Sequence, residues 1–260
     1  MNFSISKLAV ATGLATGALL SYAGTASAQS VGFKFDTVYS VDESPTGDVL
    51  LESIKIGNQI ISDFSFVQSA QIIENDEFVG GNTGAASADI GDTATGVEEY
   101  EDYGTRNVDA ETGGVKAENA TADDIVQNLS TNNLNHIIDT EDNGNFVIDL
   151  QFGKTIDNLL IWERGKNSDL GIQAVGADGQ LLGKRLEITR DMWGDVKDAD
   201  GNFLKIDTTE IQNAQAVGAL GINIFSDLDI ESGAVETIRF FSTSEFNGPD
   251  WKFVGTDATR

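Results

Sequence analysis

The side chains with the clearest chemical potential lie in two short polar segments, and the first of these is residues 139–145. It combines carboxylates and amides around Gly144, just before a run of alternating apolar residues. Calcium takes about six to eight oxygen ligands, and a loop of this composition supplies several of them. An ordinary turn is the alternative, because Asp, Asn and Gly all favour turns. The candidate calcium ligands are Asp139, Glu141, Asp142 and Asn143.

The second segment, residues 162–169, presents both charges, an amide and an aromatic ring. Sugar sites combine an aromatic face that stacks on the ring with charged and amide groups that bond to its hydroxyls. The alternative is a charged turn beside a core tryptophan, since the preceding residues 159–161 are apolar. The candidate ligand-binding residues are Trp162, Glu163, Arg164, Asn167 and Asp169.

No set of residues points to a specific reaction. A glycosidase needs two carboxylates about 5 to 10 Å apart, but the chain has 42 acidic residues, so a suitable pair exists on paper whatever the function. His136 is the single histidine and there is no cysteine, so neither a multi-histidine nor a thiolate zinc site can be built. We therefore expect a protein that is not an enzyme and requires no cofactor, with calcium as the one candidate ion.

The first 28 residues have the features of a signal peptide. Lys7 supplies the positive charge, residues 8–20 are mostly apolar, and Ala26-Ser27-Ala28 has the small-x-small form that signal peptidase cleaves. We expect cleavage near Ala28 and a mature protein that is secreted or held at the cell surface.

The composition of residues 29–260 limits the partners and the compartment. This part has 15 basic and 42 acidic residues, a formal charge of −27, which disfavours nucleic acid and anionic membranes as partners. The lack of cysteine means that an exported chain folds without disulfides. No apolar run after residue 28 approaches the roughly 20 residues of a spanning helix, so we expect no membrane span in the mature chain.

The hydrophobic pattern favours an all-β fold. Residues 31–36 and 146–152 alternate between apolar and polar side chains as strands do, and residues 155–162 are almost continuously apolar, as in a strand covered on both faces. Asp178-Gly179 is a strong hairpin signal. We predict an antiparallel β-sandwich of jelly-roll type, formed by residues 29–260 as a single domain.

Two features interrupt this strand pattern. Residues 76–120 contain 11 acidic and 2 basic residues, with glycine pairs and little apolar periodicity, so we expect a long acidic loop inserted into the domain. Thr121 and the two acids that follow it suit a helix N-terminus, and they predict one short helix.

Several sequence blocks resemble the exosortase-dependent (PEP-CTERM-type) surface proteins of cyanobacteria. The most specific is Leu160-Ile161-Trp162-Glu163-Arg164-Gly165 with Asn167-Ser168-Asp169-Leu170-Gly171. The other blocks are Gly81 to Ser87, Asn119 to Ile125, Asn132 to Asn135, Ile138 to Gly144 and Glu245 to Asp250.

The resemblance implies an exported surface or matrix protein, and it carries over no catalytic residues. Family members end in a Pro-Glu-Pro sorting tail, whereas this chain ends at Arg260 without one, which favours release, or retention by binding, over anchoring. We expect a non-catalytic cell-surface or extracellular-matrix protein that associates with polysaccharide. The alternatives are a secreted polysaccharide-acting hydrolase and a surface-layer component whose self-assembly is triggered by divalent ions.

Overall fold

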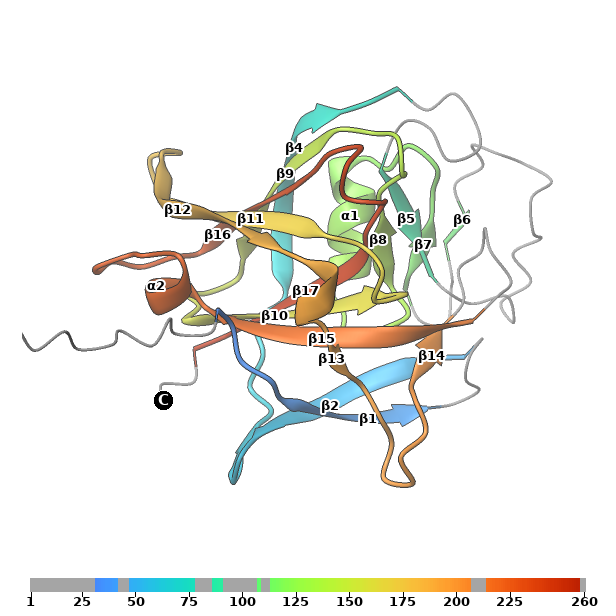
Figure 1. Cartoon of the computed structure of the whole chain (residues 1–260). Helices are drawn as coiled ribbons and strands as arrows, with labels where there is room; N and C mark the ends of the chain where they lie inside the picture. The colour runs from blue at the N-terminus through green and yellow to red at the C-terminus, as the bar shows by residue number, and fades with distance from the viewer. Residues whose placement is uncertain are drawn as a thin grey trace, which may run out of the picture. The chain divides into compact units, whose positions relative to one another are not determined.

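The computed structural model describes residues 31–41, 47–77, 86–90, 107–108, 113–206 and 214–257. The predicted signal peptide, the acidic residues 98–103 and the block from Gly81 to Ala85 lie outside these ranges. The described part consists mainly of antiparallel strands with little helix (Figure 1). The prediction of an all-β antiparallel sandwich is confirmed.

Among the described residues, a seven-stranded sheet forms the middle layer. Strand β10 (Asn158–Arg164) lies at its centre, between β15 (Gln215–Asn223) and β17 (Asp250–Thr256). The order across the sheet is β13-β15-β10-β17-β8-β5, and β14 pairs separately with β15. The outer strands are β13 (Gly194–Asp195), β14 (Lys205–Ile206), β8 (Ile137–Asp139) and β5 (Ser87–Asp89).

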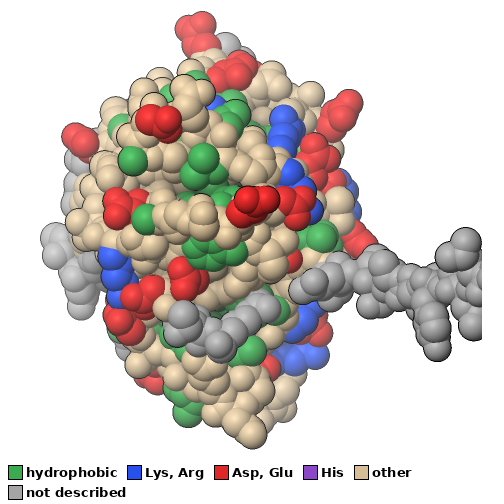
Figure 2. Space-filling view, turned by 90° about the vertical axis from the view of Figure 1, so that its left-hand side faces the viewer, with side chains coloured by type: hydrophobic (Ala, Val, Ile, Leu, Met, Phe, Trp, Pro, Cys, Tyr) green, Lys and Arg blue, Asp and Glu red, His purple; other side chains and the backbone are tan. Residues whose placement is uncertain are grey.

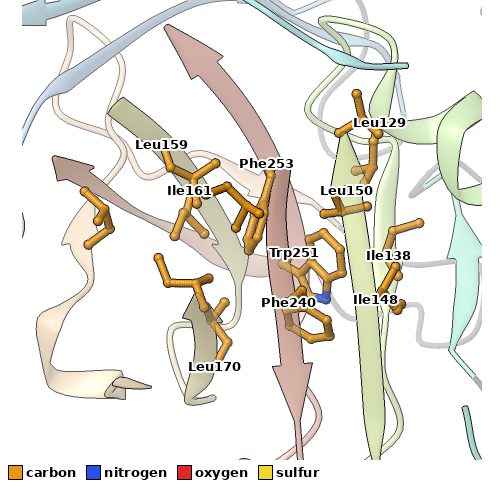
Figure 3. Packing of buried hydrophobic residues seen from close by; sticks show 14 of the residues in the cluster. Leu129, Ile138, Ile148, Leu150, Leu159, Ile161, Leu170, Phe240, Trp251 and Phe253 are labelled. Atoms are coloured by element: carbon orange, nitrogen blue, oxygen red, sulfur yellow. The ribbon is translucent and has the colours of Figure 1, made fainter. Parts of the chain in front are cut away.

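A five-stranded sheet packs on one face of this middle layer. Its order is β12-β11-β16-β9-β4. The strands are β12 (Leu181–Ile188), β11 (Leu170–Val175), β16 (Thr237–Ser242), β9 (Phe146–Phe152) and β4 (Val67–Asn75). The main core fills the space between the two sheets, and Figure 3 shows Trp251 packed among its neighbours. The Trp251 ring centroid lies 4.3 Å from that of Phe240 and 4.5 Å from that of Phe253.

A three-stranded sheet covers the other face of the middle layer. It consists of β1 (Asp36–Val41), β2 (Val49–Ile56) and β3 (Gln59–Ile61), drawn in blue below β15 in Figure 1. A second apolar cluster lies between these strands and β10, β15 and β17. Strand β10 is therefore buried on both faces, as its continuous apolar sequence predicts.

The first predicted strand is displaced along the chain. Phe33 lies outside the regular strands and forms an isolated bridge to Gly221, and the regular strand β1 begins at Asp36 rather than at residue 31. A Cβ on Gly221 would lie 2.3 Å from the Phe33 ring, so the bridge depends on the lack of a side chain at Gly221.

The predicted helix forms as α1 (Ala122–Leu129). The Thr121 hydroxyl accepts a hydrogen bond from the Asp124 amide, and the Asp124 carboxylate accepts one from the Thr121 amide, which completes a capping box. Ile125 and Leu129 point into the main core. Two shorter elements were not predicted, the one-turn helix α2 (Ile224–Asp227) and the 3-10 turn η1 (Arg190–Met192).

Parts of the predicted acidic loop contribute to the fold. Strand β5 pairs with β8, and β7 (Val115–Lys116) pairs with β6 (Asn107–Val108). The small side chains of Ala86, Ala88 and Ala117 are buried in the main core. Their burial was hidden in the sequence because these strands are only two or three residues long, too short to establish a period of two. No helix in the described part of the chain is long and apolar enough to cross a membrane.

Candidate functional site

The ends of three neighbouring strands lie together at one end of the middle sheet. Arg164 is the last residue of β10, Asp250 is the first of β17, and Asp139 is the last of β8. The register places Asp250 opposite both Arg164 and Asp139. The two predicted polar segments, which are separate in sequence, therefore lie on either side of β17.

The loops that continue from these strands are tied together by hydrogen bonds. The Thr140 hydroxyl donates to the Pro249 carbonyl at 2.8 Å, and the Ser168 hydroxyl donates to the Asn247 carbonyl at 2.6 Å. Gly248 has a φ of 48°, and a Cβ on it would lie 2.6 Å from the carbonyl oxygen of Thr140. Glycine is needed there because both the backbone conformation and the available space exclude a side chain.

The three loops enclose a pocket of about 250 Å³. Among the residues that the structure describes, its lining combines carboxylates, amides, one guanidinium, one hydroxyl and one glycine, with no apolar side chain. The lining residues are Asp139, Thr140, Glu141, Asp142, Arg164, Asn167, Gln215, Asn247, Gly248 and Asp250. Five candidates from the two predicted segments thus share one pocket: Asp139, Glu141, Asp142, Arg164 and Asn167.

Glu141 is a buried carboxyl group of the pocket with a perturbed pKa. It is 5% exposed, and its Oε1 atom has no hydrogen-bond partner among the described residues. Burial raises the pKa of Glu141 to about 7, and the nearby carboxylates of Glu118, Asp250 and Asp142 add to the effect. Glu118 is itself 8% exposed, and its Oε2 atom likewise lacks a partner within the described residues. Of these two carboxyl groups only that of Glu141 belongs to the lining, so Glu141 Oε1 is the acceptor oxygen of the pocket that the described residues leave unused.

Arg164 and Asp250 form the ion pair of the pocket. Arg164 Nη1 donates to Asp250 Oδ2 at 2.8 Å, and Arg164 Nε donates to the Ile206 carbonyl at 3.0 Å. Burial raises the pKa of Asp250, whereas Arg164 and a hydrogen bond with Asp139 act in the opposite direction. The guanidinium is thus already engaged by a protein carboxylate, which leaves the charge of the pocket negative.

Trp162 lies away from this pocket. Its side chain is 2% exposed within the second apolar cluster, where its indole nitrogen donates to the Thr37 hydroxyl at 3.0 Å. Its ring meets that of Phe35 edge-on at 5.5 Å. The prediction that the Trp162 ring stacks on a sugar is corrected. Side chains alternate along β10, so the Trp162 ring points to the face that β1 and β2 cover.

Glu163 points to the opposite face of β10 and is fully buried. The Lys166 amide donates to its Oε2 atom at 2.6 Å, while Oε1 has no partner in the described part of the chain. Burial raises the pKa of Glu163 well above its usual value. Glu163 does not line the pocket, so its role as a ligand-binding residue is not supported by its position.

Two further candidates lie beside the pocket rather than in it. Asp169 accepts hydrogen bonds from the Arg190 side chain, with Nε and Nη2 each at 3.1 Å. Arg190 and Asn143 line a second hollow, of about 390 Å³, which shares Asp142 and Asn247 with the pocket. Asp169 therefore holds Arg190 at the rim of the site.

No three His, Asp or Glu side chains in the described ranges are grouped as they would be around a metal ion. Of the four candidate calcium ligands, Asp139, Glu141 and Asp142 line the same pocket, whereas Asn143 is exposed in the neighbouring hollow. His136 lies elsewhere, 1% exposed, with its two ring nitrogens each 3.1 Å from a partner, Thr131 and Asn133.

Two larger hollows are weaker candidates for a binding site. One, of about 610 Å³, lies over strands of the five-stranded sheet, and the other, of about 600 Å³, lies beside β1. In the first, Ser69 already donates to Gln151 at 2.9 Å, and Asp149 is paired with Arg239. We prefer the smaller pocket because it holds a buried carboxyl oxygen that has no partner among the described residues, which is costly unless something binds there.

Acidic side chains also occur across the surface, as the face drawn in Figure 2 shows, where they are dispersed rather than gathered in one patch. Sequence reasoning missed Gln215, Asn247 and Asp250 as part of the lining, and it missed Glu118 as a charge near Glu141. No family model, curated protein or solved structure matches this chain. The resemblance drawn from its sequence blocks therefore stays a prediction.

Proposed function

We propose that this protein is an exported, non-catalytic binding protein of the cell surface or extracellular matrix, and that the pocket at the end of β10 binds polysaccharide. The observation that carries the proposal is the lining of the pocket, whose described side chains are polar or charged apart from one glycine. Sugar hydroxyls both donate and accept hydrogen bonds, so a wall of carboxylates and amides suits them.

The position of the lining side chains supports this proposal. Asn167, Gln215 and Asn247 come from three different segments and supply amide donors and acceptors around the carboxylates. A volume of about 250 Å³ is comparable with one sugar unit of a longer chain. Because none of the lining residues that the structure describes has an aromatic ring, we expect binding to depend on hydrogen bonds and charge rather than on stacking.

Co-sedimentation with exopolysaccharide from the source organism tests the proposal. The protein is mixed with the polysaccharide in calcium or in chelator, and the supernatant is assayed for released sugar. We expect retention without sugar release. Absence of retention in both conditions would refute polysaccharide binding, and retention only with calcium would make Asp139 and Asp142 the first metal-ligand variants to examine.

Variants at the pocket make the test specific. Asn167→Ala removes an exposed amide of the lining and should reduce retention by about 10-fold, the effect of losing one or two hydrogen bonds. Gln180→Ala is the matched control, since Gln180 is an exposed amide in the turn between β11 and β12 and does not line the pocket. Equal retention of the two variants would argue against this pocket.

A hydrolase is the second candidate function, because of one observation. Glycosidases use a carboxylic acid of raised pKa as general acid beside a second carboxylate, and the pKa of Glu141 is raised to about 7 beside Asp142 and Asp250. This function predicts that soluble sugar accumulates during co-sedimentation and that Glu141→Gln abolishes its release.

A further inference from the structure

We propose that the pocket binds the ammonium group of an amino sugar, so that the polysaccharide recognised by this protein carries free amines. This inference rests on the proposed function and names its ligand class. It starts from the charge of the described lining residues: Asp139, Glu141, Asp142 and Asp250 bring four carboxyl groups, and among these residues Arg164 alone is basic.

The single basic group does not offset these carboxyls. Arg164 is 3% exposed, and it donates hydrogen bonds to Asp250 and to the Ile206 carbonyl. A ligand that carries a carboxylate or sulfate would meet the remaining carboxyls of the pocket at close range, which costs free energy in a partly buried site. A cationic group is favoured there for the same reason.

The buried wall supplies an acceptor for such a group. Glu141 is 95% buried, lines the pocket, and leaves Oε1 without a hydrogen-bond partner among the described residues. An ammonium group has three N–H donors and no acceptor, so it can satisfy this oxygen and bond to neighbouring carboxylates at the same time. Charge-assisted hydrogen bonds of this type are about twice as strong as neutral ones.

The rest of the lining favours an amino sugar over a lysine side chain. Lysine carries its ammonium on a flexible apolar stem that is best buried against apolar surface, and the described residues of the lining include no apolar side chain. An amino sugar has hydroxyls on the carbons beside its amine, and Asn167, Gln215 and Asn247 are placed to bond to them.

The test compares two short probes that differ only at the nitrogen. Binding of the glucosamine tetrasaccharide and of its N-acetylated counterpart is measured by calorimetry in about 150 mM salt, where long-range attraction to the acidic surface is screened. Acetylation removes the positive charge. We expect the free amine to bind at least 10-fold more tightly.

Two variants locate the binding. Glu141→Gln keeps the shape of the side chain and should weaken binding of the amine probe by about 10-fold or more, the effect of losing one charge-assisted hydrogen bond. Asp142→Asn is a second pocket variant in case the first does not fold. Glu231→Gln is the matched control, since it removes the same charge from an exposed site outside the pocket.

The other outcomes overturn the inference in distinguishable ways. Equal binding of both tetrasaccharides, with both weakened by Glu141→Gln, would keep the polysaccharide site and refute the preference for amines. Equal weakening by Glu141→Gln and Glu231→Gln would mean non-specific attraction by net charge. Tight, Glu141-dependent binding of tetralysine would assign the pocket to peptide amines. Failure of both sugars to bind would refute the inference, and the polysaccharide assay would then judge the proposed function by itself.

Discussion

The buried lysine of strand β17 makes the free energy of unfolding depend strongly on pH above neutrality. Lys252 is 0% exposed, and its Nζ donates to the Asn128 carbonyl at 2.8 Å and to the His136 carbonyl at 3.2 Å. No ion pair to Lys252 occurs in the described part of the chain. Burial lowers its pKa from 10.5 to about 7.

The sign follows from proton binding in the two states. Between pH 7 and pH 10.5 the unfolded chain holds a proton on Lys252 that the folded protein has largely lost, so stability rises with pH in this range. Below pH 7 both states are protonated, and the full cost of burying the charge is present. A shift of one pKa unit is worth about 1.4 kcal/mol. The titration of Lys252 therefore changes the free energy of unfolding by about 5 kcal/mol in total, of which about 3 to 4 kcal/mol appears between pH 7 and pH 10.

Comparison with the variant Lys252→Met separates the titration of Lys252 from that of every other group in the protein. The methionine fills a similar volume and does not titrate, although it leaves the two carbonyls without the ammonium donor, which costs about 1 to 3 kcal/mol at any pH. We expect the difference in unfolding free energy, wild type minus variant, to rise by about 3 kcal/mol from pH 7 to pH 10.

Urea unfolding at pH 7, 8, 9 and 10 measures this difference. Lys55→Met, at an exposed lysine of β2, serves as the control and should keep the slope of the wild type. Parallel pH profiles for wild type and Lys252→Met would refute the reasoning, because they would mean that Lys252 keeps its proton in the folded protein.

Three further substitutions test a helix cap, a packing contact and an ion pair. Thr121→Ala removes the hydroxyl that caps α1 and should lower the unfolding free energy by about 1 kcal/mol in urea. Gly221→Ala places a methyl group against the Phe33 ring and should cost about 1 to 3 kcal/mol, most of it recovered when Phe33→Ala is added; no recovery would argue against the contact. Arg164→Met leaves Asp250 buried without its cation and should lower the unfolding free energy by about 3 to 5 kcal/mol at neutral pH. Adding Asp250→Asn to the same chain should restore part of this loss. Additive effects of the two substitutions would contradict the pairing.

The strands that could be predicted are those with long, regular patterns. Residues 146–152 alternate cleanly and form β9, and the apolar run before Arg164 forms β10, which is covered on both faces. Strand β4 was missed because Gln68 to Gln71 interrupt the apolar alternation at its start, and this strand is placed by pairing with β9. Pairing of this kind depends on residues distant in sequence, which a local pattern does not report.

The candidate site was predicted only in part. The sequence identified the two polar loops as separate sites for calcium and for sugar, and the register of β17 brings them to one pocket. Asp250 and Asn247 were missed as site residues because they come from a third loop whose position depends on the sheet order. The sequence left open whether Trp162 lies in a sugar site or in the core, and the layer that covers its face of β10 places it in the core.

The sequence by itself determined the fold class, the short helix after Thr121 and the acidic character of the chain, because hydrophobic period, capping residues and charge are local properties. Only the tertiary structure decided which polar groups are buried and what they face. Asn128 shows the difference: its side chain bonds to backbone groups of Asp89, Val115 and Ile137, from three separate strands. Burial and partnership are properties of the packed chain, and they convert ordinary residues such as Glu141 and Lys252 into perturbed ones.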